Sequence, residues 1–283
     1  ARLGLDAAFE ETQIKIGRRL AIKVLNASRF ALSMGIPWDA DEATVAAAPA
    51  PCLDASVVSE PIDRAVLAAL ADVVDAATAA FEEFGHARAL EVTESFFWTF
   101  CDDYIELVKD RANDFDGSHE PAAVRSARAT LAIAVDTFVR LLAPFLPFAT
   151  EEVWSWYRSG SVHRAAWPQS AGLREASAGA DAELVARAGA ALAALRKVKS
   201  EAKTSQKTPI LSVTLSVAAD RPEYAEAIEA VRADLTEAAK VTGPFAVEQA
   251  AQAVDSESAD GAASVAVTAA ELGEAPAKPA KKK

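Results

Sequence analysis

The sequence has 283 residues, 51% of them hydrophobic, and a formal net charge of −12 at pH 7. This length allows one large domain or two of ordinary size, with enough apolar residues for a sizeable core. The two cysteines and three histidines are scattered, which excludes a zinc-finger spacing and a disulfide framework. The most apolar region, residues 131–148, contains Asp136 and Arg140, so it is not expected to span a membrane. We therefore expect a soluble, cytoplasmic protein.

The first element expected along the chain is a helix from about Gln13 to near Gly35, with Pro37 as a stop signal. At about 100° per residue its side chains separate into two faces. The apolar face consists of Ile14, Gly17, Leu20, Ala21, Val24, Leu25, Ser28, Ala31 and Leu32. The opposite face consists of Lys15, Arg18, Arg19, Lys23, Asn26 and Arg29, with Ile22 and Phe30 among them.

The basic face of this helix has two interpretations. A run of positive charge is often only a solvated surface, but here no acidic residue occurs between Glu11 and Asp39. An amide such as Asn26 can read base edges, and an exposed ring such as Phe30 can stack on an unpaired base. Structural roles stay open for both, as a loop cap and a core-rim residue. We predict an RNA-binding surface, the basic stripe, made of Arg18, Arg19, Lys23, Asn26, Arg29 and Phe30.

The next segments are a loop and two helices. Residues 39–59 contain two prolines and no helical period, which predicts a surface loop. A serine cap and Pro61 begin a helix that Gly85 closes. The following helix, about residues 87–111, carries an aromatic stripe that is predicted to be core. Its members on one face are Phe97, Cys101, Tyr104 and Val108.

Two features of this region and the next resemble catalytic groups but are not predicted to be catalytic. Asp102 and Asp103 are adjacent, and adjacent helical residues point about 100° apart, so they cannot hold one substrate atom together. His163 has neither a nucleophile nor a partner acid in its neighbourhood of the sequence, so a structural role is expected. We predict no catalytic residue and no metal ligand in this chain.

A helix over residues 122–142 leads into a corner with two prolines. Pro144 must kink or end that helix, and Pro147 suits the first turn of another. The aromatic residues around the prolines are predicted to fill the corner. They are Phe145, Phe148 and Trp154.

The remainder of the chain has a different pattern. Residues 169–181 are rich in Ala, Gly and Ser and are expected to be a linker, followed by a small α/β domain over residues 182–270. Its expected elements are a helix at 182–203, a strand at 210–217, a helix at 222–240 and short strands at 245–247 and 263–268. Lysines at the end of the first helix are secondary RNA-contact candidates: Lys197, Lys199 and Lys203. Residues 271–283 are expected to be a disordered basic tail, either native or a cloning remnant.

Three stretches, in this order, carry a resemblance. GRRLAIKVLNASRF, residues 17–30, resembles the first helix of the anticodon-binding domain in class I aminoacyl-tRNA synthetases, most closely valyl-tRNA synthetase. DDYIELVK, residues 102–109, is similar to a second landmark of that domain. PFLPFATEEVW, residues 144–154, is similar to the hinge between its last helices and is the most specific of the three. The resemblance that these landmarks carry covers roughly residues 1–168.

The resemblance implies a mainly α fold: a helix bundle over residues 13–168 followed by the small α/β domain, with residues 1–12 as the connection from an absent catalytic domain. It implies a parent enzyme that joins valine to tRNA using ATP and Mg²⁺, with tRNA and the parent's catalytic and editing domains as partners. Nucleotide-binding signatures of the HIGH and KMSKS type are absent from this stretch. We therefore expect a non-catalytic fragment without a cofactor of its own.

Three other functions compete with this assignment. An isoleucine-type synthetase is a close rival, although many of its members hold zinc through a C-terminal cysteine cluster that has no counterpart here. A helical module that binds an acidic protein through the basic face is a second alternative, which salt dependence and competition by tRNA would distinguish. An independent hydrolase has no nucleophile constellation to support it. The long heptad coiled coil that ends many valine enzymes is also absent, so its contacts are not carried over.

Overall fold

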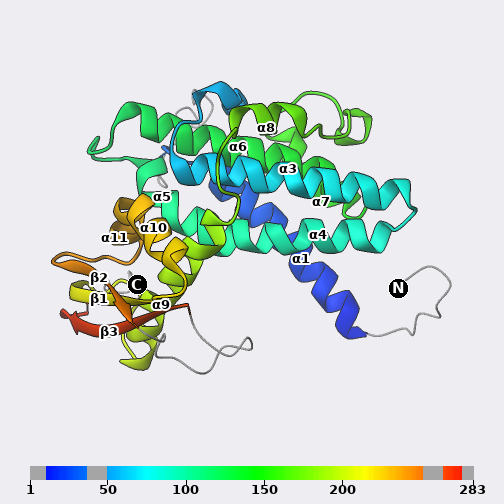
Figure 1. The fold of residues 1–283 in the computed structure, drawn as a ribbon. Helices are drawn as coiled ribbons and strands as arrows, with labels where there is room; N and C mark the ends of the chain where they lie inside the picture. Colours follow the sequence, from blue (N-terminus) through cyan, green and yellow to red (C-terminus); the bar gives the residue numbers. More distant parts are fainter. Residues whose placement is uncertain (1–10, 37–49, 251–263, 276–283) are drawn as a thin grey trace, which may run out of the picture. The chain divides into compact units, whose positions relative to one another are not determined.

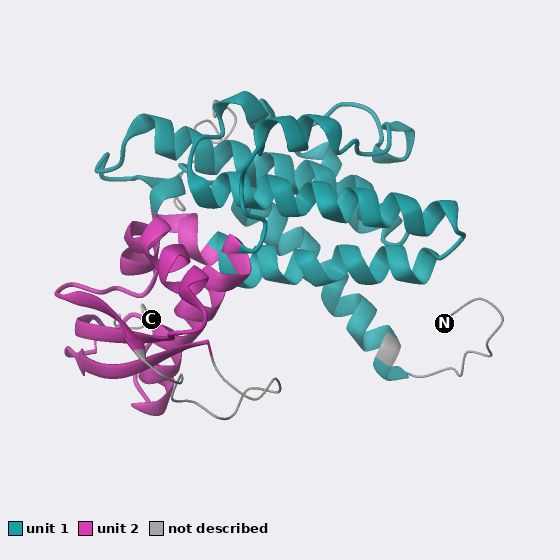
Figure 2. Cartoon of the chain, viewed as in Figure 1, with its two compact units in different colours: residues 1–105, 111–183 teal, residues 106–110, 184–283 magenta. Residues whose placement is uncertain are grey.

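The computed structural model describes residues 11–36, 50–250 and 264–275. The chain divides into two compact units (Figures 1 and 2), with residues up to 105 and 111–183 in unit 1 and residues 106–110 and 184–283 in unit 2. Several expectations fall wholly or largely outside the described residues: the connection at 1–12, most of the loop at 39–59 and most of the tail at 271–283. Within the described residues, no helix is long and apolar enough to cross a membrane.

Unit 1 is a bundle of helices, as the apolar periodicity predicts. Prolines in the first turns of α3, α6 and α7 remove N–H groups that would lack helical partners at those positions. The elements are α1 (Glu11–Leu32), η1 (Ala55–Val57), α3 (Pro61–Glu82), α4 (His86–Thr99), η2 (Phe100–Tyr104), α5 (Ile105–Asn113, of which 106–110 are assigned to unit 2), α6 (Pro121–Leu142), α7 (Pro147–Ser155), η3 (Val162–Arg164) and α8 (Ala171–Ala176).

The core of unit 1 lies between α3, α4 and α6, which contact one another. Leu67 and Leu70 of α3 and Leu131 of α6 are fully buried. Phe138 of α6 contacts the aromatic stripe of the predicted 87–111 helix, with ring centroids 5.2 Å from Phe97 and 5.3 Å from the ring of Phe100. The predicted core stripe, Cys101 included, is buried.

That predicted helix is interrupted by a π-helical turn, η2, between α4 and α5. A π turn carries one more residue than an α turn and rotates the residues after it about the helix axis. It allows Phe100 and Tyr104 to stack in the core at 5.7 Å while Asp102 stays exposed. Asp102 is exposed and Asp103 is half-buried, so neither side chain belongs to the buried aromatic stripe.

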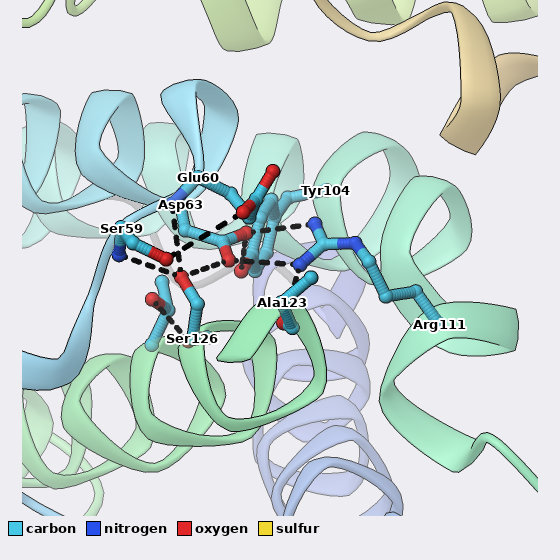
Figure 3. A network of polar contacts seen from close by, with 8 residues as sticks. Ser59, Glu60, Asp63, Tyr104, Arg111, Ala123 and Ser126 are labelled. Atoms are coloured by element: carbon cyan, nitrogen blue, oxygen red, sulfur yellow. Dashed lines mark hydrogen bonds and ion pairs between the residues drawn. The ribbon is translucent and has the colours of Figure 1, made fainter. Parts of the chain in front are cut away.

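A polar network crosses this core (Figure 3). Asp63 of α3 is fully buried, and its carboxylate accepts from the Tyr104 hydroxyl at 2.8 Å and from the Ser126 hydroxyl at 2.6 Å. The Arg111 guanidinium donates to both carboxylate oxygens at 3.0 Å and also to the Ala123 carbonyl at 2.9 Å. Because the buried charge is paired and fully hydrogen-bonded, it ties α3, η2, α5 and α6 together. Burial, and then the neighbouring carboxylate, raises the pKa of Tyr104 well above its ordinary value.

At the corner with two prolines, the structure differs from the sequence expectation in one residue. Phe145 stacks on Phe81 at 5.8 Å, and Trp154 is 8% exposed. Phe148, predicted to fill the corner, is instead 89% exposed. The reason is helix geometry, because Thr150, Val153 and Trp154 are the buried residues of α7 and lie on the side opposite to residue 148.

Residues 169–181, expected to be a linker, contain α8 and pack against α3. Arg174 of α8 forms ion pairs with Asp72 and Asp75 of α3, and the Arg64 guanidinium donates to the carbonyl of Ala178 at 2.5 Å. The segment is therefore part of unit 1, held by ion pairs and backbone carbonyls that its composition did not indicate.

Unit 2 is a small α/β unit with a three-stranded sheet in the order β2-β1-β3. The central strand pairs in parallel with β2 and antiparallel with β3. The expected helix at 222–240 is two helices, because the chain leaves helical geometry at Val231 (φ −120°), whose side chain is buried. The elements are α9 (Leu184–Glu201), β1 (Ile210–Ala218), α10 (Pro222–Ala230), α11 (Arg232–Ala238), β2 (Phe245–Ala250) and β3 (Val265–Leu272).

Candidate nucleic-acid interface

Helix α1 carries the basic stripe, and α6 and α7 hold it. Its side chains toward the bundle are buried from Leu20 onward, the others being Val24, Ala27, Ser28 and Ala31. The first two turns extend beyond the neighbouring helices (Figure 1), and there Ile14 and Gly17, which the periodicity assigns to the apolar face, are exposed. The periodicity thus identified the buried side of α1 but not where along the helix burial begins.

The opposite side of α1 presents most of the basic stripe to solvent. Arg18, Arg19, Asn26 and Arg29 are exposed, and Phe30 is 42% exposed, so its ring is not a core residue. Among the described residues, no carboxylate lies within ion-pair distance of the three arginines, and the Asn26 side chain caps no loop. Charge, an amide and an aromatic ring therefore share one accessible surface.

Lys23, the remaining member of the stripe, is in a different environment. Its Nζ lies 2.8 Å from Asp102 Oδ1 and 5.4 Å from the centroid of the Trp98 ring. The ion pair partly neutralises its charge. The arginines are therefore the stronger candidates for phosphate contacts.

Helix α7 adds an aromatic surface beside Arg29. The Arg29 Cζ lies 5.1 Å from the centroid of the Trp156 ring. The exposed Phe148 and Glu152 precede Trp156 by two turns and one turn, on one side of the helix. Sequence reasoning missed Phe148 and Trp156 as surface residues. Their spacing of two helical turns, on the side away from the buried Thr150 and Trp154, was the signal.

The secondary candidates in unit 2 differ in exposure. Lys197 and Lys203 are exposed, with Lys197 Nζ 3.9 Å from Glu201. Lys199 is 1% exposed, and its Nζ donates to the carbonyls of Gln206 at 3.0 Å and Ala239 at 2.6 Å. Burial, followed by the positive charges of Lys240 and Arg196, lowers the pKa of Lys199 to about 8. A buried lysine bonded to two carbonyls cannot reach RNA, so we remove Lys199 from the candidates.

Other polar clusters among the described residues have local structural explanations. His163 Nε2 lies 3.2 Å from the Pro147 carbonyl oxygen and supports the corner. Asp114, Asp116 and His119 gather in the turn before α6. There Asp114 Oδ1 accepts from the His119 backbone N–H at 3.0 Å, and Asp116 Oδ1 accepts from Ser118 N–H at 3.1 Å. These bonds define a turn.

Comparison with known proteins adds named relatives. The chain is 52% identical to the valine–tRNA ligase of Bifidobacterium longum (strain NCC 2705) over 98% of its own length and 31% of that protein. It is 51% identical to the valine–tRNA ligase of Thermobifida fusca (strain YX) and 44% identical to that of Cutibacterium acnes, in each case over 85% of this chain and 25% of the relative. The chain thus spans a third or less of the length of these proteins.

The family match has defined limits along the chain. A model of the anticodon-binding domain of tRNA ligase matches residues 63–215, which is more than half of the chain. The match begins after α1, so the basic stripe lies outside it, whereas the Bifidobacterium alignment extends over nearly the whole chain. By the extent of this match, the chain belongs to the family of anticodon-binding domains of tRNA ligases.

Proposed function

We propose that this chain is the C-terminal part of a valine–tRNA ligase and binds the anticodon region of tRNA(Val) through the basic stripe of α1. The observation that carries the proposal is the exposed set of Arg18, Arg19 and Arg29, with no carboxylate in ion-pair distance among the described residues. The surface is locally positive on a chain of net charge −12. Because binding depends on the local field, an acidic body is compatible with an RNA-binding face.

The members of the stripe have different roles in this proposal. The arginines contact phosphates, which supplies affinity without reading sequence. The Phe30 ring stacks on an unpaired base of the anticodon loop, and the Asn26 amide reaches a base edge. Lys197 and Lys203 remain proposed secondary contacts from unit 2.

Catalysis belongs to other parts of the parent chain in this proposal. The parent joins valine to its tRNA with ATP and Mg²⁺, and its catalytic and editing domains are the partners of this chain. No glycine-rich phosphate loop occurs in the sequence, so no residue here is assigned to ATP. We expect the parent to act in the cytoplasm and the isolated chain to support no valine-dependent ATP–pyrophosphate exchange.

A salt titration of tRNA(Val) binding tests the proposal. Each phosphate that the protein neutralises releases counterions, so the affinity should fall steeply between about 50 and 200 mM salt. Arg29→Ala should weaken binding of every tRNA and flatten the salt slope by about one unit at most. Arg88→Ala is the matched control, because Arg88 is an exposed arginine in a surface ion pair with Glu91 on α4, outside the stripe.

The same experiment separates the alternatives. Preference for tRNA(Ile) over tRNA(Val) would favour the isoleucine-type assignment. If an acidic protein partner bound to the stripe is not displaced by tRNA, the surface is a protein-interaction module and the proposal fails. Equal effects of Arg29→Ala and Arg88→Ala would also refute it.

A further inference from the structure

The Arg29 guanidinium makes a cation–π contact with the Trp156 indole, and a hydrogen bond to Glu152 fixes the orientation of that indole. The Trp156 ring lies under the Arg29 guanidinium, 5.1 Å from Cζ to the ring centroid. Its indole N–H donates to Glu152 Oε1 at 3.0 Å. Glu152 precedes Trp156 by one helical turn, the spacing at which helical side chains meet.

The same arrangement occurs on a second helix. Trp98 of α4 lies under Lys23, 5.4 Å from Nζ to the ring centroid, and its indole N–H donates to Glu94 Oε1 at 3.2 Å. Glu94 again precedes the tryptophan by one turn. Two helices that are separate in sequence therefore each place a Glu-held indole under a cation of the basic stripe. We call each Glu–Trp pair an indole clamp.

The clamp has a physical effect on the cation above it. A cation over an indole face is attracted by the ring quadrupole. The hydrogen bond from the indole N–H to a carboxylate is charge-assisted, so it fixes the orientation of the ring and polarises it toward the cation. Lysine and arginine have many rotamers, and a fixed platform reduces the number that a phosphate must select from.

We propose that Trp156 with Glu152, and Trp98 with Glu94, are positioning residues that hold Arg29 and Lys23 in the geometry that binds tRNA. This inference rests on the proposed function. The larger effect is expected at Trp156. Arg29 has no carboxylate partner among the described residues, whereas Lys23 is also held by Asp102 at 2.8 Å.

Affinity of the whole chain for a tRNA(Val) transcript tests this inference. Trp156→Ala should weaken binding about 3- to 10-fold at low salt, in proportion to the cation–π interaction that is lost. Trp156→Phe keeps a ring face but lacks the indole N–H that Glu152 holds, so it should recover only part of that loss. In an Arg29→Ala background, Trp156→Ala should have no further effect, because the ring acts through the arginine.

The glutamate provides a matched pair of variants. Glu152→Gln and Glu152→Ala remove the same negative charge, which by itself should strengthen binding of an anion. Only the glutamine keeps an acceptor for the indole N–H. We therefore expect Glu152→Ala to bind tRNA(Val) more weakly than Glu152→Gln. Since Glu152 is exposed, this pair decides the question even if Trp156→Ala does not fold.

The outcomes separate the two proposals. If Arg29→Ala leaves binding unchanged, the proposed function fails. If Arg29→Ala weakens binding but Trp156→Ala does not, or if its effect persists undiminished in the Arg29→Ala background, the positioning role is overturned while the proposed function stands. Equal affinities of the two Glu152 variants would overturn it as well.

Discussion

Unit 1 contains two groups of charged side chains that differ in burial and in ion pairing. In the Asp63 network, Arg111 is buried and both carboxylate oxygens of Asp63 are satisfied inside the protein. In the basic stripe, Arg18, Arg19 and Arg29 are exposed and lack carboxylate partners among the described residues. The same side-chain chemistry thus serves stability where every donor finds an internal acceptor. In the proposed interface it is available for binding, because an acceptor for the exposed arginines would have to come from another molecule.

The largest effect is expected when the Asp63 carboxylate is removed from the buried network. Asp63→Ala leaves the Arg111 charge buried without its partner, which should lower the free energy of unfolding by about 3–5 kcal/mol. Chemical denaturation measures it. Asp72→Ala is the control, because its ion pair with Arg174 is exposed to solvent and screened, so its loss should change the stability little. Similar effects of the two changes would mean that the Asp63 network does not tie these helices together.

A second test uses the aromatic residues of the corner. Trp154→Ala should lower the free energy of unfolding by about 3–5 kcal/mol, because it leaves a cavity in a packed site. Phe145→Ala should lower it less, because the Phe145 side chain is only half-buried. Phe148→Ala should change stability by less than about 0.5 kcal/mol because the ring is exposed. Thermal melts of the three variants give the ranking. A large destabilisation by Phe148→Ala would contradict the exposed position of the ring.

A third test addresses the uncharged members of the stripe. Phe30→Ala should weaken tRNA(Val) binding by about 1–3 kcal/mol through loss of stacking, with the salt slope and the melting temperature unchanged. Asn26→Ala should narrow the difference in affinity between tRNA(Val) and a tRNA with another anticodon. If Phe30→Ala lowers the melting temperature by several degrees without changing the affinity of the folded protein, Phe30 has a structural role only.

The smallest expected effect concerns the two cysteines, which differ in burial as the two charged groups do. Burial raises the pKa of the Cys101 thiol to about 12. Its thiolate is therefore scarce at pH 8, whereas Cys52 is exposed. A thiol reagent at pH 8 should modify Cys52 rapidly and Cys101 only after denaturation. Mass spectrometry of the labelled protein gives the result, and rapid labelling of native Cys101 would contradict the packing of the aromatic stripe.

The sequence predicted most helices and strands of the described residues because their signals are local. Pro61 marks the first turn of α3, the helix predicted from residue 122 begins at Pro121, and alternation predicted β1 at 210–217, where the strand covers 210–218. The break of the 222–240 helix at Val231 was not predicted. That residue leaves helical geometry and buries its side chain, and neither the periodicity nor a Gly or Pro signals the change.

The candidate site was predictable to the same extent and for the same reason. The rotation of a helix sets which residues share a face, so the sequence alone determined that Arg18, Arg19, Asn26, Arg29 and Phe30 lie on one side of α1. It could not determine that Lys199 is buried, because this depends on carbonyls at Gln206 and Ala239 that the fold brings to it.

Only the tertiary structure decided what lies against each face. Burial on α1 begins at Leu20 because the bundle ends there, and Ile14 is left exposed although it has the same hydrophobic character. Trp156 lies under Arg29 because α7 packs against α1 at a particular offset, and a side-chain contact across from α4 places Trp98 under Lys23. Side-chain direction follows from the rotation of one helix, but contacts between helices depend on how far each is shifted along the other. That shift is set by the packing of the whole core.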